Sequence, residues 1–248
     1  MTTIALLDGD IFAFEVAAAA EVATDWGDGL WTLHAHEAPA KATLADRVQS
    51  LVEAVGADEL IIALSDKANF RKNILPTYKA NRNGIRRPML LPILRDYLRE
   101  NYEVFERPGL EGDDVLGILS TWDQLKGTKV IVTKDKDFNT IPCNVYFAHH
   151  PDDGIKSVSE EEADYFHMVQ TLTGDATDNY KGCPGCGPVK AEKVLTADPD
   201  KTLWEKVVAA YVKAGLCEEE ALVQARCARI LRACDYDFKK KEPILWTP

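Results

Sequence analysis

Three carboxylates fall within four residues in the stretch Glu111-Gly112-Asp113-Asp114. An apolar run at helical spacing follows, so the acids are expected at the start of an amphipathic helix, where the helix dipole favours negative charge. Three acids at one point repel one another strongly unless a cation lies between them. An acid-rich helix start is common on its own, and it is the other acids of the chain that favour a metal site here.

Further acids follow the predicted strands. Three short apolar runs are typical of buried strands: residues 3–8, 59–64 and 129–133. Acids stand at or just after the ends of these runs: Asp8, Asp66, Asp135 and Asp137. The carboxyl ends of parallel strands meet at one edge of a sheet, which is where ligands bind. A single acid there is more often a cap or turn residue. Together with Glu111, Asp113 and Asp114, however, these acids make seven at one edge, and seven indicate a cation site.

The order of elements predicts the fold class. Strands that alternate with helices predict an α/β fold with a mostly parallel central sheet flanked by helices. The expected helices cover residues 11–23, 39–55, 88–101 and 111–125, with a turn at 25–30 and a short edge strand at 144–147. From about residue 158 the pattern is helical, at 159–173, 201–214 and 218–234. We therefore expect two domains, 1–157 and an all-helical region 158–248.

Composition indicates a soluble globular protein. The chain has 248 residues, 46% of them hydrophobic, and no apolar run long enough to span a membrane. The N-terminus lacks the features of a signal peptide, so a cytoplasmic location is expected. The net charge of −11 argues against a nucleic-acid partner, but nine of the acids are assigned below to metal binding. The charge therefore does not exclude DNA.

The six cysteines are expected to be reduced thiols. Cys183 and Cys186 have the spacing of a zinc or redox site, but no second pair of cysteines or histidines completes four ligands. We interpret both as small apolar residues.

The donor set at the strand ends consists of carboxylates alone. Such oxygen donors select magnesium or manganese, and two ions held close together can activate a water and stabilise a leaving oxygen. Serine-nucleophile and phosphate-loop motifs are absent.

A basic segment follows the second strand. No acid occurs from Lys67 to Arg95, and the segment carries six cations between Phe70 and Pro88: Arg71, Lys72, Lys79, Arg82, Arg86 and Arg87. One interpretation is a solvated loop. We favour a phosphate-contacting arch at about residues 67–100, because each cation can displace counterions from a nucleic-acid backbone.

Five motifs occur in one order: Asp8-Gly9, Phe70-Arg71 with 75–82, Glu111 to Asp114, Thr133 to Asp137, and Gly174 to Asn179. Together they resemble the flap endonuclease / 5′→3′ exonuclease family, especially the small free-standing members of tailed bacteriophages. The resemblance covers about residues 3–195, and the last fifty residues carry no motif of the family.

The resemblance implies roles for these residues. The first metal would be held by Asp8, Asp66, Glu111 and Asp113. The second site would consist of Asp114, Asp135, Asp137 and Asp178, with Asp175 nearby. Lys79 and Arg82 would hold the scissile phosphate and act in catalysis with Asp8, Asp113 and Asp135. Arg71 and Lys72 would contact DNA, and Tyr78 would stack on an unpaired base.

The glycine-rich stretch within residues 174–195 resembles the helix–three-turn–helix of the family. Gly185 and Gly187 would let the backbone approach phosphate, and Lys190 and Lys193 would point toward the duplex. The resemblance implies duplex binding and a potassium ion held by carbonyls, although cysteines replace β-branched residues and Pro188 precedes the valine. The alternative is a tight turn between packed helices.

The implied function is a structure-specific 5′ nuclease in DNA replication, primer removal or repair. It would be a monomer that cleaves at free 5′ ends, at flaps and on nicked or branched duplexes, with RNA–DNA hybrids as a further substrate. Two alternatives stay open, a ribonuclease of the PIN type and a non-catalytic protein that binds branched DNA. The basic arch and the glycine hairpin argue against the first, and the full set of acids argues against the second.

Overall fold

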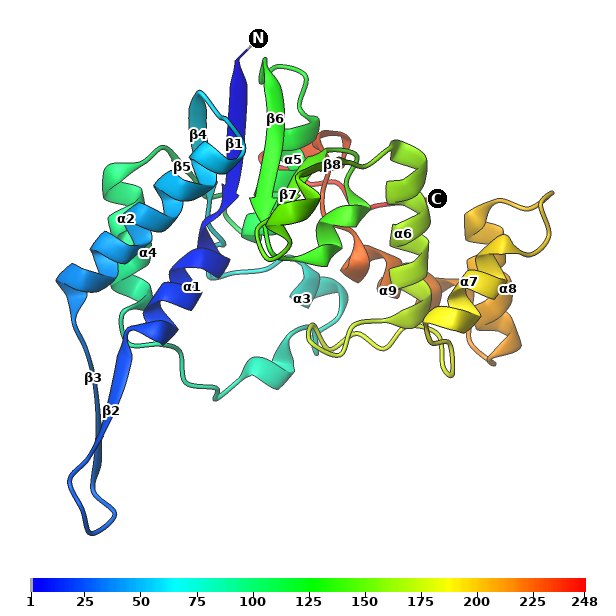
Figure 1. Cartoon of the computed structure of the whole chain (residues 1–248). Coiled ribbons are helices and arrows are strands. Elements are labelled where there is room, and N and C mark those ends of the chain that lie inside the picture. The colour runs from blue at the N-terminus through cyan, green and yellow to red at the C-terminus, as the bar shows by residue number, and fades with distance from the viewer. Residues whose placement is uncertain (1) are drawn as a thin grey trace.

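The computed structural model describes residues 2–248, and its centre is a mostly parallel sheet (Figure 1). Six strands form the sheet in the order β5-β4-β1-β6-β7-β8: β1 Thr3–Asp8, β4 Glu59–Ala63, β5 Val104–Phe105, β6 Thr128–Thr133, β7 Asn144–Phe147 and β8 Ile155–Ser157. All neighbours pair parallel except β7 and β8. The α/β prediction is confirmed, but β7 is not the edge strand, because β8 pairs beyond it.

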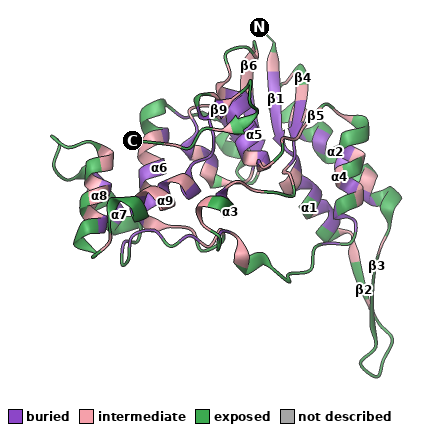
Figure 2. Cartoon of the chain, turned by 180° about the vertical axis from the view of Figure 1, so that it is seen from behind, coloured by how far each residue is buried: buried purple, intermediate pink, exposed green. Residues whose placement is uncertain are grey.

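Side chains of β1 point alternately into two hydrophobic cores, as the pleat of a strand requires. One core holds Leu7 with the helices α1 (Gly9–Ala19), α2 (Glu37–Ala54) and α4 (Leu91–Asn101). The other holds Leu6 with α5 (Gly112–Thr121) on the opposite face. These layers bring the end of β1 and the start of α5 to the same rim of the sheet. In Figure 2 most of β1 and much of α5 are coloured as buried.

The C-terminal part packs around a third core. It contains α6 (Glu160–Thr173), α7 (Pro188–Thr196), α8 (Leu203–Lys213) and α9 (Glu218–Ala228). Cys183 and Cys186 are buried in this core, as expected for small apolar residues. After α9 the chain returns to the sheet, where Ile230 and Leu231 join the second core.

Two short hairpins differ from the prediction. Residues expected at the end of the first helix form β2 (Glu21–Asp25), which pairs with β3 (Trp31–Ala35) in a hairpin that extends from the body (Figure 1). The alanine-rich run favours a helix, but the glycines of the turn adopt positive φ and allow the chain to reverse. The expected all-helical region also contains a small hairpin of β9 (Tyr236–Asp237) and β10 (Glu242–Pro243).

The predicted arch is helical only in parts. Between β4 and α4 it contains α3 (Arg71–Ile74) and a single 3-10 turn, η1 (Ala80–Arg82). Its far end is joined to the first hairpin, because the Arg86 guanidinium and the Met89 backbone N–H both donate to the Glu21 carboxylate. Further 3-10 turns are η2 (Lys136–Thr140), η3 (Pro151–Asp153) and η4 (Ala233–Asp235). No helix of residues 2–248 combines the length and apolar character needed to cross a bilayer.

Candidate active site

An acid-lined cavity of about 490 Å³ lies beyond the carboxyl ends of β1 and β6. We call it the acidic hollow. Eight carboxylates line it: Asp8, Asp10, Glu111, Asp113, Asp135, Asp137, Asp175 and Asp178. Lys79, Arg82 and Lys136 line it as well. The structure therefore brings together most of the acids and both catalytic cations expected from the sequence.

Asp8 enters the hollow from the end of β1. One carboxylate oxygen caps α1 by accepting from the Ile11 N–H at 3.3 Å, and the other accepts from the Thr133 hydroxyl at 2.9 Å. Burial and the neighbouring Asp10 raise the pKa of Asp8 to about 7. The side chain is thus held rigidly where its charge is poorly compensated.

The start of α5 supplies Glu111 and Asp113. Burial raises the pKa of Asp113 well above its usual value, and the charges of Asp8 and Asp135 raise it further. Burial also acts on Glu111, but Lys79 and Arg71 outweigh it and hold the pKa of Glu111 at about 2. One acid of the pair therefore lacks a cation partner and the other has two.

The loop after β6 supplies Asp135 and Asp137. The Asp135 carboxylate accepts from the Asp137 N–H at 2.8 Å, and Gln170 of α6 donates to Asp137 at 2.6 Å. Burial raises the pKa of both acids, that of Asp137 to about 7, and the charge of Asp135 adds to the effect on Asp137.

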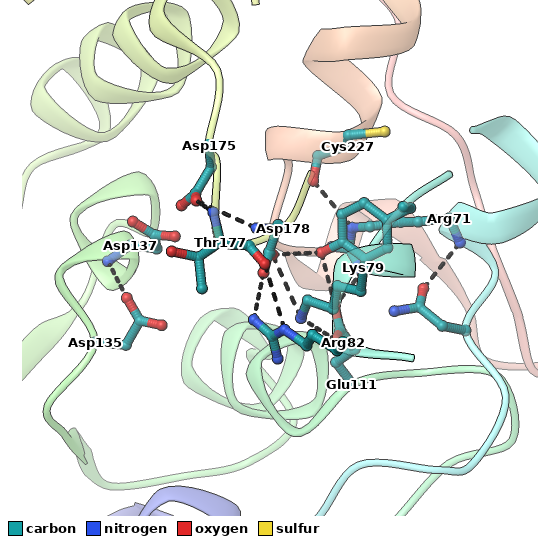
Figure 3. A network of polar contacts seen from close by, with 12 residues as sticks. Arg71, Lys79, Arg82, Glu111, Asp135, Asp137, Asp175, Thr177, Asp178 and Cys227 are labelled. Carbon is teal, nitrogen blue, oxygen red and sulfur yellow. Dashed lines mark hydrogen bonds and ion pairs between the residues drawn. The ribbon is translucent and has the colours of Figure 1, made fainter. Parts of the chain in front are cut away.

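Two cations face these acids from the basic segment (Figure 3). The Lys79 ammonium contacts the Glu111 carboxylate and lies 3.4 Å from Asp178. Arg82 donates to Asp178 at 2.7 Å and keeps about half of its side chain exposed. Asp175 turns back to its own loop and accepts from the Thr177 N–H. Both cations therefore pair with acids of the hollow, Lys79 with Glu111 and Asp178 and Arg82 with Asp178.

The donor set fits divalent cations. Within residues 2–248, no three acidic, histidine or cysteine side chains form a ready-made metal-binding group. The buried acids nevertheless face one another with raised pKa values, because their negative charges lack compensation. A cation among carboxylate oxygens would supply that compensation, and hard divalent ions prefer such oxygens.

Two acids expected as metal ligands have other partners. Asp66 does not line the hollow, and its carboxylate accepts from the N–H groups of Gly109 and Lys67, which lowers its pKa. Asp114 is fully buried and pairs in a bidentate manner with Arg71, at 2.7 and 2.8 Å. Local spacing places both acids at the correct edge, but backbone donors and a buried cation occupy them.

Two residues expected to contact DNA are buried. Both Arg71 and Tyr78 line the hollow, but the exposed fraction of each is only 2%, which leaves little surface for contact with a nucleic acid. The Tyr78 hydroxyl shares its one proton between Asp178 at 2.7 Å and Glu111 at 3.1 Å, and its buried ring is not free to stack on a base. Lys72, the neighbour of Arg71, is exposed as expected.

One acid of the hollow was not predicted. Asp10 accepts from the Ser65 N–H at 2.7 Å, and Arg95 lies 3.3 Å from its other oxygen. The spacing Asp8-Gly9-Asp10 directly after a strand was the signal for it. Gln170 and the residues 227–230 had no such signal, because they come from helices distant in the sequence.

The glycine-rich loop lies between α6 and α7. Gly185 adopts a positive φ of 63°, and no atom lies within 4 Å of the Cβ position of Gly185 or Gly187. Lys190 and Lys193 are exposed on α7. The loop therefore presents accessible backbone next to two cations, and its contact with DNA stays a prediction.

Comparisons with known proteins agree with this geometry. Residues 3–173 match the family described as "5'-3' exonuclease, N-terminal resolvase-like domain". The chain belongs to this 5′-3′ exonuclease family. It is 33% identical to the exonuclease of Escherichia phage T7 over 281 residues, which covers 99% of this chain and 93% of that protein. The family resemblance expected from the five motifs is thereby confirmed.

Solved structures share the fold of this family member. The T5 5′-exonuclease with bound zinc matches with a TM-score of 0.64 at 16% identity, over 91% of each chain. A bacteriophage T5 D15 flap endonuclease variant, in a complex with DNA and metal ions, matches with a TM-score of 0.58 at 17% identity. That match covers 91% of this chain and 93% of the T5 chain.

Proposed function

We propose that this family member is a structure-specific 5′ nuclease that needs divalent metal ions. It hydrolyses phosphodiesters of DNA as a 5′→3′ exonuclease and as a flap endonuclease, and it accepts RNA–DNA hybrids. The observation that carries the proposal is the acidic hollow, in which eight carboxylates face Lys79 and Arg82. The T7 and T5 relatives, named exonuclease and flap endonuclease, support the reaction type.

The proposed cofactors are two magnesium or manganese ions. Asp8, Glu111 and Asp113 would hold the first, and Asp135, Asp137 and Asp178 would hold the second, with Asp175 nearby. When bound, such ions supply an activated water and stabilise the leaving oxygen. The solved T5 relatives contain divalent ions, which supports the metal but not its identity.

Lys79 and Arg82 have the proposed task of holding the scissile phosphate. Lys79 reaches the hollow from a left-handed backbone position, with φ of 53°, and both cations now pair with acids at its rim. A phosphate oxygen that carries developing charge would compete for the same donors. Preorganised cations stabilise such a transition state without further rearrangement.

The duplex would lie across both parts of the chain. In this proposal residues 1–157 supply most of the acids for cleavage, and residues 158–248 add Asp175 and Asp178 and hold the duplex through the glycine-rich loop, Lys190 and Lys193. A potassium ion at the loop carbonyls is part of the proposal, since Gly182 and Gly185 adopt positive φ there. The protein would act as a monomer in the cytoplasm of the host cell, and the bacteriophage origin of a relative is consistent with a bacterial host.

The decisive test is cleavage of a 5′-labelled flap duplex, a blunt duplex and a single-stranded RNA, each with magnesium and with a chelator. We expect magnesium-dependent cutting of both DNA substrates from the 5′ side, with product lengths that give the exonuclease-to-flap ratio. Cutting of the RNA alone would support a PIN-type ribonuclease. Tight DNA binding without cutting in magnesium or manganese would support a non-catalytic DNA-binding protein.

A further inference from the structure

Residues 227–235, which comprise the last turn of α9 and the segment after it, carry no motif of the family, yet they form one wall of the acidic hollow. Cys227, Ala228 and Ile230 line the cavity together with the acids. The segment reaches this place because α9 ends at Ala228 and the chain then returns to the sheet instead of continuing as a helix. We call residues 227–235 the C-terminal latch.

Arg71 joins the latch to the acidic start of α5. All five of its N–H donors have partners: the carbonyls of Cys227 and Arg229, both oxygens of Asp114, and Glu111. These partners lie 40 to 158 positions from Arg71 in the sequence. Figure 3 shows Arg71 between Cys227 and Glu111. A fully satisfied, buried guanidinium of this kind fixes orientation, because any shift leaves a charged donor unpaired.

The latch also contacts α5 directly. The Leu231 N–H donates to Asp114 at 3.1 Å, and the Ala233 N–H donates to the Thr121 hydroxyl at 2.8 Å. Gly117 lies so close to the Leu231 carbonyl that a Cβ there would overlap it. The start, middle and end of α5 are thus held by the same segment.

Two ion pairs fix the conformation of the latch, one within it and one that joins it to α6. Arg229 donates to Asp235 at 2.8 Å, and Arg232 donates to Asp164 of α6 at 2.6 Å. Arg232 also donates to the Thr140 carbonyl at the end of η2, the turn that begins with Asp135 as its cap. The latch therefore contacts two of the four chain segments that supply acids to the hollow, α5 and the turn after β6.

We infer that the C-terminal latch positions the catalytic acids Glu111 and Asp113. Arg71 is the positioning residue, because it binds the latch on one side and the start of α5 on the other. The inference rests on the proposed nuclease function and assigns Arg71 no contact with substrate. Displacement of a catalytic group by about 1 Å can cost on the order of 100-fold in rate. Loss of the latch should therefore lower kcat and leave the DNA-binding surface intact.

The first test variant is Gly117→Ala, which pushes the latch away without changing a charge or a residue of the hollow. We expect kcat on a 5′-labelled blunt duplex to fall by about 10- to 100-fold, with KM within about twofold of wild type. The matched control is Ser120→Ala on the same helix, whose hydroxyl bonds only to the Gly117 carbonyl. Its kcat should stay within about twofold of wild type.

The second test is a series at Arg71 that does not depend on the Gly117 variant folding. Arg71→Lys keeps the charge beside Asp114 and Arg71→Gln removes it, so kcat should decrease from wild type to Lys to Gln at constant KM. The dependence of binding on salt should also stay that of wild type. A phosphate contact would instead lower the salt slope by about one upon Arg71→Gln, as we expect for Lys72→Ala.

Three outcomes decide between the hypotheses. Wild-type kcat in both Gly117→Ala and Arg71→Lys would overturn the role of the latch. A reduced salt slope in Arg71→Gln would overturn the positioning role and make Arg71 a DNA contact. Absence of cleavage by the wild-type protein itself would overturn the proposed function instead, so the two failures are distinguishable.

Discussion

At the scale of single residues, the acids of the hollow differ mainly in whether they have a partner. Glu111 has two cations and a low pKa, whereas Asp8 is buried and Asp113 and Asp137 are half-buried near other acids, and all three have raised pKa values. The acids without cation partners are the ones that a divalent ion would compensate. Glu111 and Asp178, which are also proposed as ligands, already share the charge of Lys79.

Asp135→Asn is the sharpest test of the second metal site. We expect loss of cleavage by at least about 100-fold, with DNA binding unchanged or tighter, because the change removes a negative charge that faces the substrate. Gel-shift binding and magnesium-dependent cleavage of the same labelled duplex would measure both effects. Undiminished cleavage would show that Asp135 holds no essential ion.

Asp66→Asn should behave differently, although both acids follow strands. Asp66 accepts two backbone hydrogen bonds outside the hollow, so we expect kcat within about threefold of wild type. The cost should appear in stability, at about 1 kcal/mol from a weakened hydrogen bond, measured by thermal unfolding. A loss of cleavage equal to that of Asp135→Asn would return Asp66 to the list of metal ligands.

At the scale of elements, short irregular segments place the cations. The predicted arch is mostly loop, and Lys79 depends on the left-handed backbone before η1 and on the bond from its N–H to the Asp178 carbonyl. The position of η1 is therefore fixed by a contact with the loop before α7 rather than by formation of a longer helix. A cation held in this way can meet a phosphate without rearrangement of the backbone.

Lys79→Ala should slow the chemical step more than it weakens binding. Removal of one preorganised donor typically costs about 100- to 1,000-fold in kcat, and we expect KM to change less than about fivefold. Lys72→Ala is the matched control, because this exposed lysine lies outside the hollow and should affect KM alone. If Lys79→Ala raised only KM, Lys79 would be a general phosphate contact.

At the scale of the whole molecule, the hollow makes stability depend on pH and on metal. Asp8 and Asp137 have pKa values of about 7 in the folded chain, against 3.8 for an ordinary aspartate. A carboxyl group whose pKa is raised by folding stabilises the fold while it is protonated, and this contribution is lost as pH rises from about 4 to about 7. The metal-free protein should therefore become less stable across that range.

Thermal unfolding in chelator at pH 5.5 and pH 7.5 would measure this effect. We expect a lower Tm at pH 7.5, a smaller difference in Asp137→Asn, and a rise in Tm at pH 7.5 when magnesium is added, because the folded state binds the ion. Glu111 does not contribute in this window, since its lowered pKa affects stability only below about pH 4.5. An equal Tm at both pH values, unaffected by magnesium, would contradict the hypothesis that the negative charges of the hollow are uncompensated in the metal-free protein.

Much of the fold follows from local patterns in the sequence. Buried strands read as continuous apolar runs, and their order along the chain predicts a parallel sheet whose carboxyl ends share one rim. Asp8, Asp113 and Asp135 could therefore be placed together from the sequence. The β2–β3 hairpin could not, since the alanine-rich residues before it favour a helix and only the turn glycines reverse the chain.

The sequence by itself determined the sheet, the rim at which the acids collect, and the order of motifs that identifies the family. Only the tertiary structure decided which of these acids and cations are free to act. Asp114 and Arg71 fit the same sequence pattern as Asp113 and Lys79, but they pair with each other across 43 positions. The latch, which lies near the C-terminus, contacts both of them. Strand periodicity and strand ends are local properties, whereas the choice of a partner for a buried charge depends on the packing of the whole chain.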